Sequence, residues 1–429
     1  MKRPVHLSDL RGFSRLAVEA TIGVTDLVEE MHRSVTSLPA SGAADPARRE
    51  RMRGITGFVY RTVRRITRWV GGGVDRALAK LQPLLLAGVA DAGYAGPAGA
   101  LPVPTSRHRD ALLAALNGVL GDHLEASGNP LAIPMQFRRD GQALDPAHEK
   151  GGRILLLVHG LCRSDVQWVR KEHNHGARLA AELGFTDVYL HYNSGRSIAS
   201  NGSELAERLE TLLQAWPEPV TELVVVAHSM GGLVIRSACH VADTSEGPAL
   251  LWRDRLRKII FLATPHLGAP LERGGNWVTL ALDKSSYTAA FARLGRIRSA
   301  GITDLRHGQV LPLPERDRFA RASGHTHSPP LPVGVACYAA AATLAPGPDP
   351  GARSRVSTAA RIVLGDGLVP LASGLGDDPD PAKALTIPTT RRFIGYGMNH
   401  LDLLDRREVY ERIREWLAEP AISGTLVAR

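Results

Sequence analysis

The chain has 429 residues, of which 44% are hydrophobic and 22% are charged. This composition excludes wholesale disorder and predicts a soluble, folded protein. The net charge is +9, and +7 of it lies between Arg48 and Arg68, where eight arginines stand against one acid. Because the excess is local, a diffuse nucleic-acid-binding surface is not expected, and no nucleic-acid partner is predicted.

The first residues, MKRPVHLSDLRGF, lack the apolar core that a secretory signal needs. No stretch of the chain reaches the roughly 18 apolar residues that span a bilayer. The three cysteines, Cys162, Cys239 and Cys337, are too few and too scattered for a disulfide framework or a zinc site. We therefore expect reduced cysteines, no metal, and a cytoplasmic location with at most peripheral membrane contact.

Residues 1–150 are predicted to form an N-terminal helical extension, because apolar residues recur at helical spacing without strand-like alternation. The predicted elements, in chain order, are helices at Leu16–Val35, Ile55–Val70 and Val74–Ala87, a proline- and glycine-rich linker near 95–106, and a helix at Asp110–Ala126. The glycines Gly71–Gly73 are expected to end the second helix.

The helix predicted at Ile55–Val70 has one apolar and one basic face. Its basic face carries Arg61, Arg64, Arg65 and Arg68. One interpretation is that the Arg48–Arg68 segment docks on an anionic membrane surface, where each arginine contributes on the order of 1 kcal/mol. The other is that the apolar face packs on neighbouring helices or on the remaining core, with the arginines in water. Both are open, and the packing interpretation is preferred.

Residues 151–429 are predicted to form a separate α/β domain, because short apolar strands alternate with helices. The predicted strands are Ile154–Val158, Asp187–Tyr192, Leu223–Ala227, Lys258–Ala263, Gly334–Ala340 and Arg361–Leu364. The predicted helices are Arg178–Leu183, Gly202–Ala215, Leu233–Ala242 and Asp405–Leu417. Strands that are continuously apolar indicate a mostly parallel sheet with helices on both faces.

Ser229 is the candidate nucleophile, because the sequence AHSMG places it between a buried strand and a helix. A serine on this sharp turn needs small neighbours two residues before and after it, and Ala227 and Gly231 are small. The helix N-terminus beyond Ser229 directs backbone N–H groups toward a developing oxyanion. His228 and Met230 complete the turn.

A second turn, VHGL, follows the predicted strand at Ile154–Val158. Where a serine lies on such a strand-to-helix turn, the loop after an earlier strand of the sheet supplies one donor to the oxyanion. The predicted oxyanion hole therefore consists of the backbone N–H groups of Leu161 and Met230. The pair His159 and Gly160 allows the loop to turn, and His159 is interpreted as a supporting residue rather than a proton carrier.

Asp366 and His400 complete the candidate triad, because the acid and then the histidine must follow the serine along the chain. Asp366 lies in the glycine turn LGDGLVP, and His400 lies in GMNHLDLL before the last predicted helix. The histidine would act as the base, and the acid would orient it. The competing residues are Asp377, Asp378, Asp402, His240, His266, His307, His325 and His327.

Five motifs in this order, VHGL, AHSMGGL, ATPHLGAP, GDGLVP and NHLDLL, resemble the α/β-hydrolase superfamily, particularly lipases and GPI-inositol-deacylase-like serine esterases. The resemblance covers residues 153 to about 418 and departs from the usual pattern in having Ala227 in place of glycine. It implies hydrolysis of a carboxylic ester, from a lipid or another acyl compound, without a metal or organic cofactor. The stretch after ATPHLGAP, from Leu271 to about Gly308, is long enough to form a helical cap or lid insertion at about 271–308.

Two alternatives to an esterase remain open. The same triad could serve acyl transfer or amide hydrolysis, which the sequence does not separate from ester hydrolysis. The fold could also be a catalytically silent scaffold or a membrane-associated binding protein, although the presence of all three triad residues favours an enzyme. The sequence makes no prediction of oligomeric state.

Overall fold

The computed structural model describes residues 7–36, 61–77, 107–245, 250–269, 299–312, 329–347 and 365–420. The chain divides into two compact units. The first comprises residues 1–103 and 126–131, and the second comprises residues 104–125 and 132–429.

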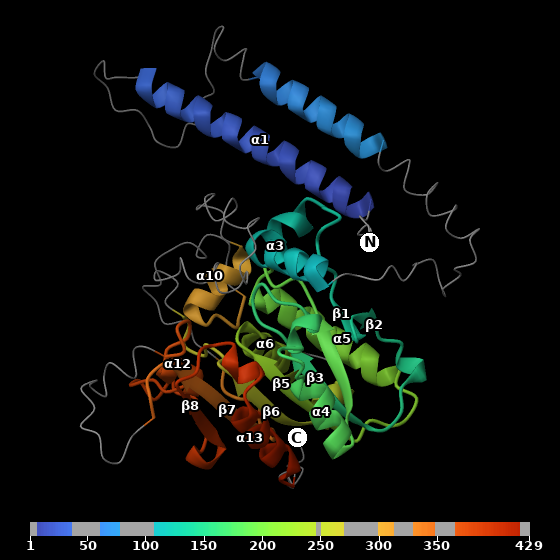
Figure 1. The fold of residues 1–429 in the computed structure, drawn as a ribbon, viewed down its shortest axis with the longest axis vertical. Coiled ribbons are helices and arrows are strands. Elements are labelled where there is room, and N and C mark those ends of the chain that lie inside the picture. The colour runs from blue at the N-terminus through green and yellow to red at the C-terminus, as the bar shows by residue number, and fades with distance from the viewer. Residues whose placement is uncertain are drawn as a thin grey trace. The chain divides into compact units, whose positions relative to one another are not determined.

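The second unit contains an eight-stranded sheet with the strand order β2-β1-β4-β3-β5-β6-β7-β8 (Figure 1). In that order, the strands are β2 (Gln142–Ala143), β1 (Gln136–Arg139), β4 (Thr186–His191), β3 (Arg153–Val158), β5 (Glu222–His228), β6 (Leu256–Leu262), β7 (Ala336–Thr343) and β8 (Arg392–Tyr396). The six strands from β4 to β8 run parallel, whereas β1 pairs antiparallel with both β4 and β2.

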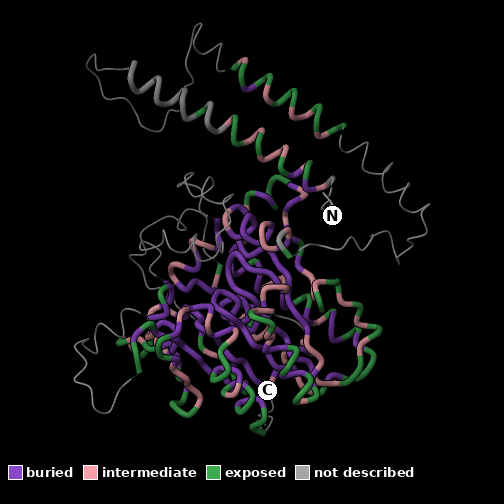
Figure 2. The backbone as a smooth tube through the Cα atoms, viewed as in Figure 1, coloured by how far each residue is buried: buried purple, intermediate pink, exposed green. Residues whose placement is uncertain are grey.

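Helices cover both faces of the sheet, which explains why its central strands are apolar without alternation. In β3, Ile154 and Leu156 pack in the same core cluster as helices α5 (Ile198–Gln214) and α6 (Met230–Thr244). The alternating residues Leu155 and Leu157 face the cluster formed with helices α4 (His175–Leu183) and α13 (Arg407–Ala418). Figure 2 shows the buried backbone concentrated in these layers.

This arrangement is the α/β-hydrolase fold, as the sequence predicts. The first five predicted strands are present, each with bounds within three residues of the prediction. The predicted strand at Arg361–Leu364 lies outside the described residues. Strands β1, β2 and β8 were not predicted, because they are short and only partly buried and so carry no continuous apolar run.

The first unit contains helix α1 (Leu7–Thr36) and a second helix at 61–77. The prediction that Gly71–Gly73 ends the second helix is wrong, because the helix continues through all three glycines. A Cβ atom on Gly71 would lie 2.2 Å from a methyl carbon of Val18 on α1, so the glycine permits close approach of the two helices. The remainder of the predicted helices, residues 55–60 and 78–87, lies outside the described residues.

Helix α3 (Arg107–Ala126) belongs largely to the sheet-bearing unit, so the units divide near residue 104 rather than at residue 150. A Cβ atom on Gly118 of α3 would lie 2.2 Å from Cys162 Sγ, and Asn193 donates a hydrogen bond to the Gly121 carbonyl at 2.8 Å. These contacts attach α3 to loops that follow β3 and β4. The predicted linker and most of the predicted cap lie outside the described residues, apart from helix α10 (Ala300–His307).

Candidate active site

Ser229 lies on a strained turn between β5 and α6. Its backbone has φ 53° and ψ −125°, a conformation that residues other than glycine rarely adopt. The Ser229 N–H donates to the Leu262 carbonyl at 2.8 Å, which fixes the turn to the neighbouring strand. Ala227, the last small residue before the turn, is fully buried. The geometry is that of a nucleophile elbow.

Two glycines allow the loop after β3 to approach this elbow. A Cβ atom on Gly160 would lie 2.8 Å from Ser229 Cβ, and one on Gly231 would lie 2.5 Å from the Val158 carbonyl oxygen. Any larger residue at either position would push the loop and the elbow apart. The sequence pattern of small residues therefore has a direct steric cause.

Leu161 and Met230, the residues predicted to form the oxyanion hole, are both buried. Met230 is the first residue of α6, where the backbone N–H has no partner within the helix. Among the described residues, no hydrogen bond uses the N–H of Leu161. Both groups are thus available to donate to an oxyanion.

The loop that carries Leu161 is held by residues that the sequence analysis did not assign to the site. Tyr192 donates its hydroxyl hydrogen bond to the His159 carbonyl at 2.8 Å, and the Cys162 N–H donates to Ser194 Oγ at 3.0 Å. Both partners lie just after β4, more than 30 residues along the chain. The only available signal was that the segment YNSGRS follows a strand at the same edge of the sheet.

Asp366 and His400 form a buried pair. His400 Nδ1 lies 2.7 Å from Asp366 Oδ2, and the other carboxylate oxygen accepts the N–H groups of Leu368 at 2.9 Å and Val369 at 2.8 Å. The His400 N–H also donates to the Asp366 backbone carbonyl at 3.1 Å. These backbone N–H groups therefore hold the Asp366 carboxylate in place independently of the imidazole. The carboxylate favours the His400 tautomer that carries the ring proton on Nδ1.

His228 places this pair beside the elbow. Its ring centroid lies 4.6 Å from that of His400, and its Nε2 atom lies 3.2 Å from the His400 carbonyl oxygen. Burial lowers the pKa of His228 well below its usual value, with the nearby His400 adding to the effect, so His228 is neutral and donates from Nε2. Ser229, the next residue, has no hydrogen bond from its Oγ atom to the described residues.

His159 is a structural part of the loop that follows β3. Its ring stacks on Tyr192 with a centroid separation of 4.4 Å, and its Nδ1 atom lies 2.9 Å from the Gly160 carbonyl oxygen. Burial lowers the pKa of His159 to about 3. A histidine that stays neutral and donates to its own loop supports the loop and does not transfer protons in the neutral range.

The competing acids are engaged elsewhere. Asp377 forms an ion pair with Arg392 at 2.7 Å, and Asp402 accepts the N–H of Asn399 at 3.0 Å. His266 is buried, and its Nδ1 atom lies 3.4 Å from a guanidinium nitrogen of Arg236. Of the candidates that the structure describes, Asp366 and His400 are the acid and histidine that meet.

The described part of the chain holds no group of three residues able to bind a metal ion and no helix long and apolar enough to cross a membrane. All three cysteines are free and buried, and burial raises the pKa of both Cys162 and Cys337 to about 12. These thiols are therefore protonated and unreactive at neutral pH.

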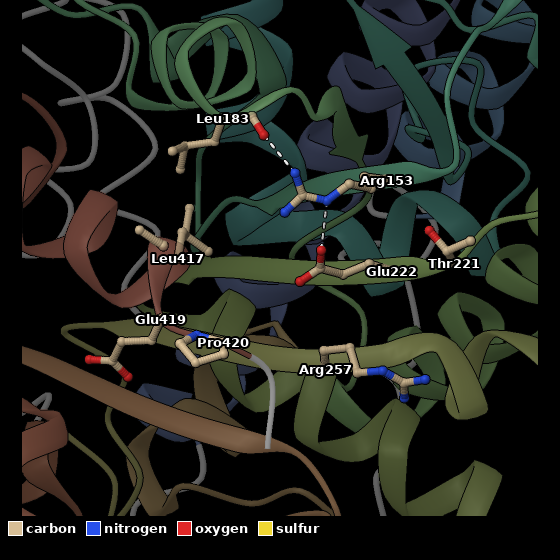
Figure 3. A pocket seen from close by; sticks show the side chains of 9 residues that line it. Arg153, Leu183, Thr221, Glu222, Arg257, Leu417, Glu419 and Pro420 are labelled. Carbon is tan, nitrogen blue, oxygen red and sulfur yellow. Dashed lines mark hydrogen bonds and ion pairs between the residues drawn. The ribbon is translucent and has the colours of Figure 1, made fainter. Parts of the chain in front are cut away.

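A cavity of about 520 Å³ lies at the amino edge of the strands, away from the elbow (Figure 3). There Arg153 pairs with Glu222 at 2.7 Å and donates to the Leu183 carbonyl at 2.6 Å. Arg153 and Glu222 thus neutralise each other at the start of β3 and β5, whereas Ser229 follows the carboxyl end of β5.

Comparison with known proteins gives the following relatives. The sequence model of a domain of unknown function (DUF7379) matches residues 132–307. No curated protein matches the sequence. A lipase from Bacillus licheniformis, BlEst2 in its mature form, is similar in structure with 18% identity over 66% of this chain and 98% of that chain, at a TM-score of 0.40.

Two further solved structures are similar at lower scores. The metagenomic carboxyl esterase MGS0156 has 16% identity over 73% of this chain and 88% of that chain, at a TM-score of 0.33. The lipase of Staphylococcus hyicus has 14% identity over 64% of this chain and 96% of that chain, at a TM-score of 0.34.

Proposed function

We propose that the protein is a serine hydrolase that cleaves carboxylic esters through an acyl-enzyme on Ser229. The observation that carries the proposal is the buried Asp366–His400 pair, which lies against His228 and so next to a serine in strained backbone geometry. A buried acid and base beside an unpartnered hydroxyl is an arrangement that nucleophilic catalysis requires and that packing alone does not.

In the first half-reaction, Ser229 Oγ attacks the ester carbonyl carbon while its proton passes to His400 Nε2. The proton on Nδ1 remains on the imidazole and donates to Asp366 Oδ2, so the carboxylate stabilises the imidazolium that forms. The carbonyl oxygen becomes an oxyanion that accepts from the N–H groups of Leu161 and Met230. The intermediate collapses as the alcohol leaves with the proton from Nε2.

In the second half-reaction, water replaces the alcohol. It gives a proton to His400 Nε2 and attacks the acyl carbon, and collapse of the second intermediate returns the proton to Ser229 Oγ and releases the carboxylic acid. No atom in this cycle comes from a metal or a cofactor. Lipid or other long acyl esters are the substrate class that the motif order favours, with GPI-inositol-deacylase-like activity as one member of that class.

A fluorophosphonate probe tests the proposal directly. Such a probe labels a serine only where a base activates it, so peptide mass spectrometry of the labelled protein should find the adduct on Ser229. The matched control is Ser237→Ala, because Ser237 is equally buried on the same helix and takes no part in the site. Labelling should survive this change and be lost in His400→Ala. Folded protein that takes up no probe would instead identify a silent scaffold.

Protein that has not been treated with the probe separates hydrolysis from acyl transfer. Turnover of p-nitrophenyl esters of increasing chain length in water should release free acid, and the optimum length reports the acyl site. If an added alcohol or amine captured most of the acyl group in place of water, the assignment would change to acyltransferase, with the triad unchanged.

A further inference from the structure

The helix at 61–77 buries a polar face rather than an apolar one. Arg64 is only 1% exposed and pairs with Asp26 of α1 at 2.6 Å. Asp75, one turn beyond Gly71, accepts from Arg11 at 3.2 Å and from Arg15 at 2.9 Å. Charged groups and a glycine therefore join the two helices.

The apolar side chains of this helix are exposed to solvent. Figure 2 colours most of the helix as exposed or intermediate. Its residues and exposed fractions are Val63 at 40%, Ile66 at 56%, Trp69 at 79%, Val70 at 54% and Val74 at 43%. Positions 63, 66, 70 and 74 recur every three or four residues, so they form one stripe, and Trp69 lies beside it. Helix α1 therefore does not cover this face, and packing of the face on the remaining core stays a prediction.

The rest of the exposed surface of the helix is basic. Arg65, Arg68 and Arg76 are exposed, and the single acid of the segment, Asp75, is engaged by α1. The helix itself carries five arginines and one acid, and four further arginines precede it at 48–53. The surface thus combines a strip of aliphatic and tryptophan side chains with strong positive charge.

We propose that this helix docks on an anionic lipid surface, with Trp69 and the aliphatic stripe in the interface and the arginines on lipid phosphates. A second copy of the chain fits the apolar stripe less well, because it would bring two strongly basic helices together. A nucleic acid would match the charge but leave the stripe in water. An anionic bilayer satisfies both features at once.

This inference goes beyond the proposed esterase activity and does not depend on it. The docking helix and the triad belong to different compact units, so each can fail without the other. If both hold, docking would concentrate the enzyme on the phase that contains lipid ester substrates. Ser229→Ala protein should therefore bind vesicles as well as the parent protein.

Co-sedimentation of the full chain with vesicles tests the proposal. We expect binding to phosphatidylcholine vesicles that contain phosphatidylserine, little binding to phosphatidylcholine alone, and a steep loss of binding as salt rises. Arg65→Gln with Arg68→Gln should weaken binding roughly 25-fold, since each arginine contributes about fivefold. Trp69→Ser should weaken it on the order of tenfold.

Matched controls lie in the other unit. Arg208→Gln with Arg407→Gln removes the same charge from exposed arginines, and Val333→Ser removes a hydrophobic side chain that is 83% exposed. Both should bind like the parent. All test positions are exposed, and circular dichroism would verify that each variant is folded.

Three outcomes would overturn the proposal. The first is an absence of binding to anionic vesicles at low salt. The second is an equal loss of binding in the control and helix variants, which would show a net-charge effect. The third is a concentration-dependent dimer that Trp69→Ser dissociates, which would identify a second copy of the chain as the occupant of the stripe.

Discussion

The two edges of the central sheet use the same strands in opposite ways. At the carboxyl edge, Ser229 has a strained backbone and a hydroxyl without a described partner, beside the buried pair of Asp366 and His400. At the amino edge, Arg153 and Glu222 face a cavity of about 520 Å³ but neutralise each other. The cavity at the amino edge therefore lies at the opposite end of the strands from the proposed catalytic residues.

The amino edge is also closed by a buried cation. Lys258 Nζ donates to the carbonyls of Trp416 and Leu417, each at 2.9 Å, and so satisfies the end of α13. Burial lowers the pKa of Lys258, but the group remains fully engaged with these carbonyls. The charged groups at the amino edge stabilise the fold. At the carboxyl edge, the N–H groups of Leu161 and Met230 have no described acceptor and could donate to a ligand. Substitutions at the two edges should therefore affect different measurements.

The largest effect is expected from Ser229→Ala. Loss of the nucleophile should reduce kcat on p-nitrophenyl esters by on the order of 10⁵- to 10⁶-fold. The thermal midpoint should not fall, because removing a hydroxyl that lacks a described partner leaves no hydrogen bond unmade. Ester cleavage at the parental rate by this variant would remove Ser229 from the mechanism.

Asp366→Asn should reduce kcat by about 10⁴-fold. The amide oxygen would accept the two N–H groups of Leu368 and Val369, which leaves the NH₂ group facing His400 and forces the proton onto Nε2. That tautomer cannot take the serine proton. Asp402→Asn is the control in the neighbouring loop and should retain most activity; comparable losses in both would point to loop disruption rather than tautomer selection.

His175 gives the carboxyl side of the sheet a pH-dependent stability. It is fully buried, its Nε2 atom lies 3.1 Å from the Leu403 carbonyl oxygen, and burial lowers its pKa to about 4. The unfolded chain binds this proton near pH 6.5 and the folded chain does not, so the free energy of unfolding should fall as pH drops from about 6.5 to 4, by about 3 kcal/mol from this residue.

Urea unfolding at several pH values measures this contribution. His175→Gln keeps a donor for the Leu403 carbonyl but cannot become charged, so its stability should depend less steeply on pH than that of the parent. His148→Gln is the control, since His148 is exposed. Parallel stability curves for parent and His175→Gln would contradict a neutral, buried His175.

The smallest effect is expected from Arg153→Met at the amino edge. The pair with Glu222 is partly exposed, so its loss should cost about 1 kcal/mol of stability or less. Activity on p-nitrophenyl esters should be unchanged within error. A large loss of activity in Arg153→Met would contradict the view that the two edges have separate roles, and it would give the amino-edge cavity a catalytic role.

The sequence predicted those parts of the site that are local in the chain. The elbow at Ser229 and the turn at Gly160 are recognisable because steric crowding requires small residues at fixed spacing. The supports of the oxyanion loop were missed, because the bonds of Tyr192 and Ser194 join residues more than 30 positions apart and carry no spacing signal. The amphipathic pattern at 61–77 revealed two faces but did not indicate which one is buried.

The packing of α3 on the loop after Leu161 determines how the protein can be shortened. A fragment that begins at residue 132, where the family match begins, would omit the surface on which Cys162 rests and the carbonyl that Asn193 contacts. Expressed alone, it would contain Ser229, Asp366 and His400 and still lack the helix that packs on the loop after β3. We expect a fragment that begins near residue 104 to keep this packing and therefore to be the better choice for crystallisation and for enzyme assays.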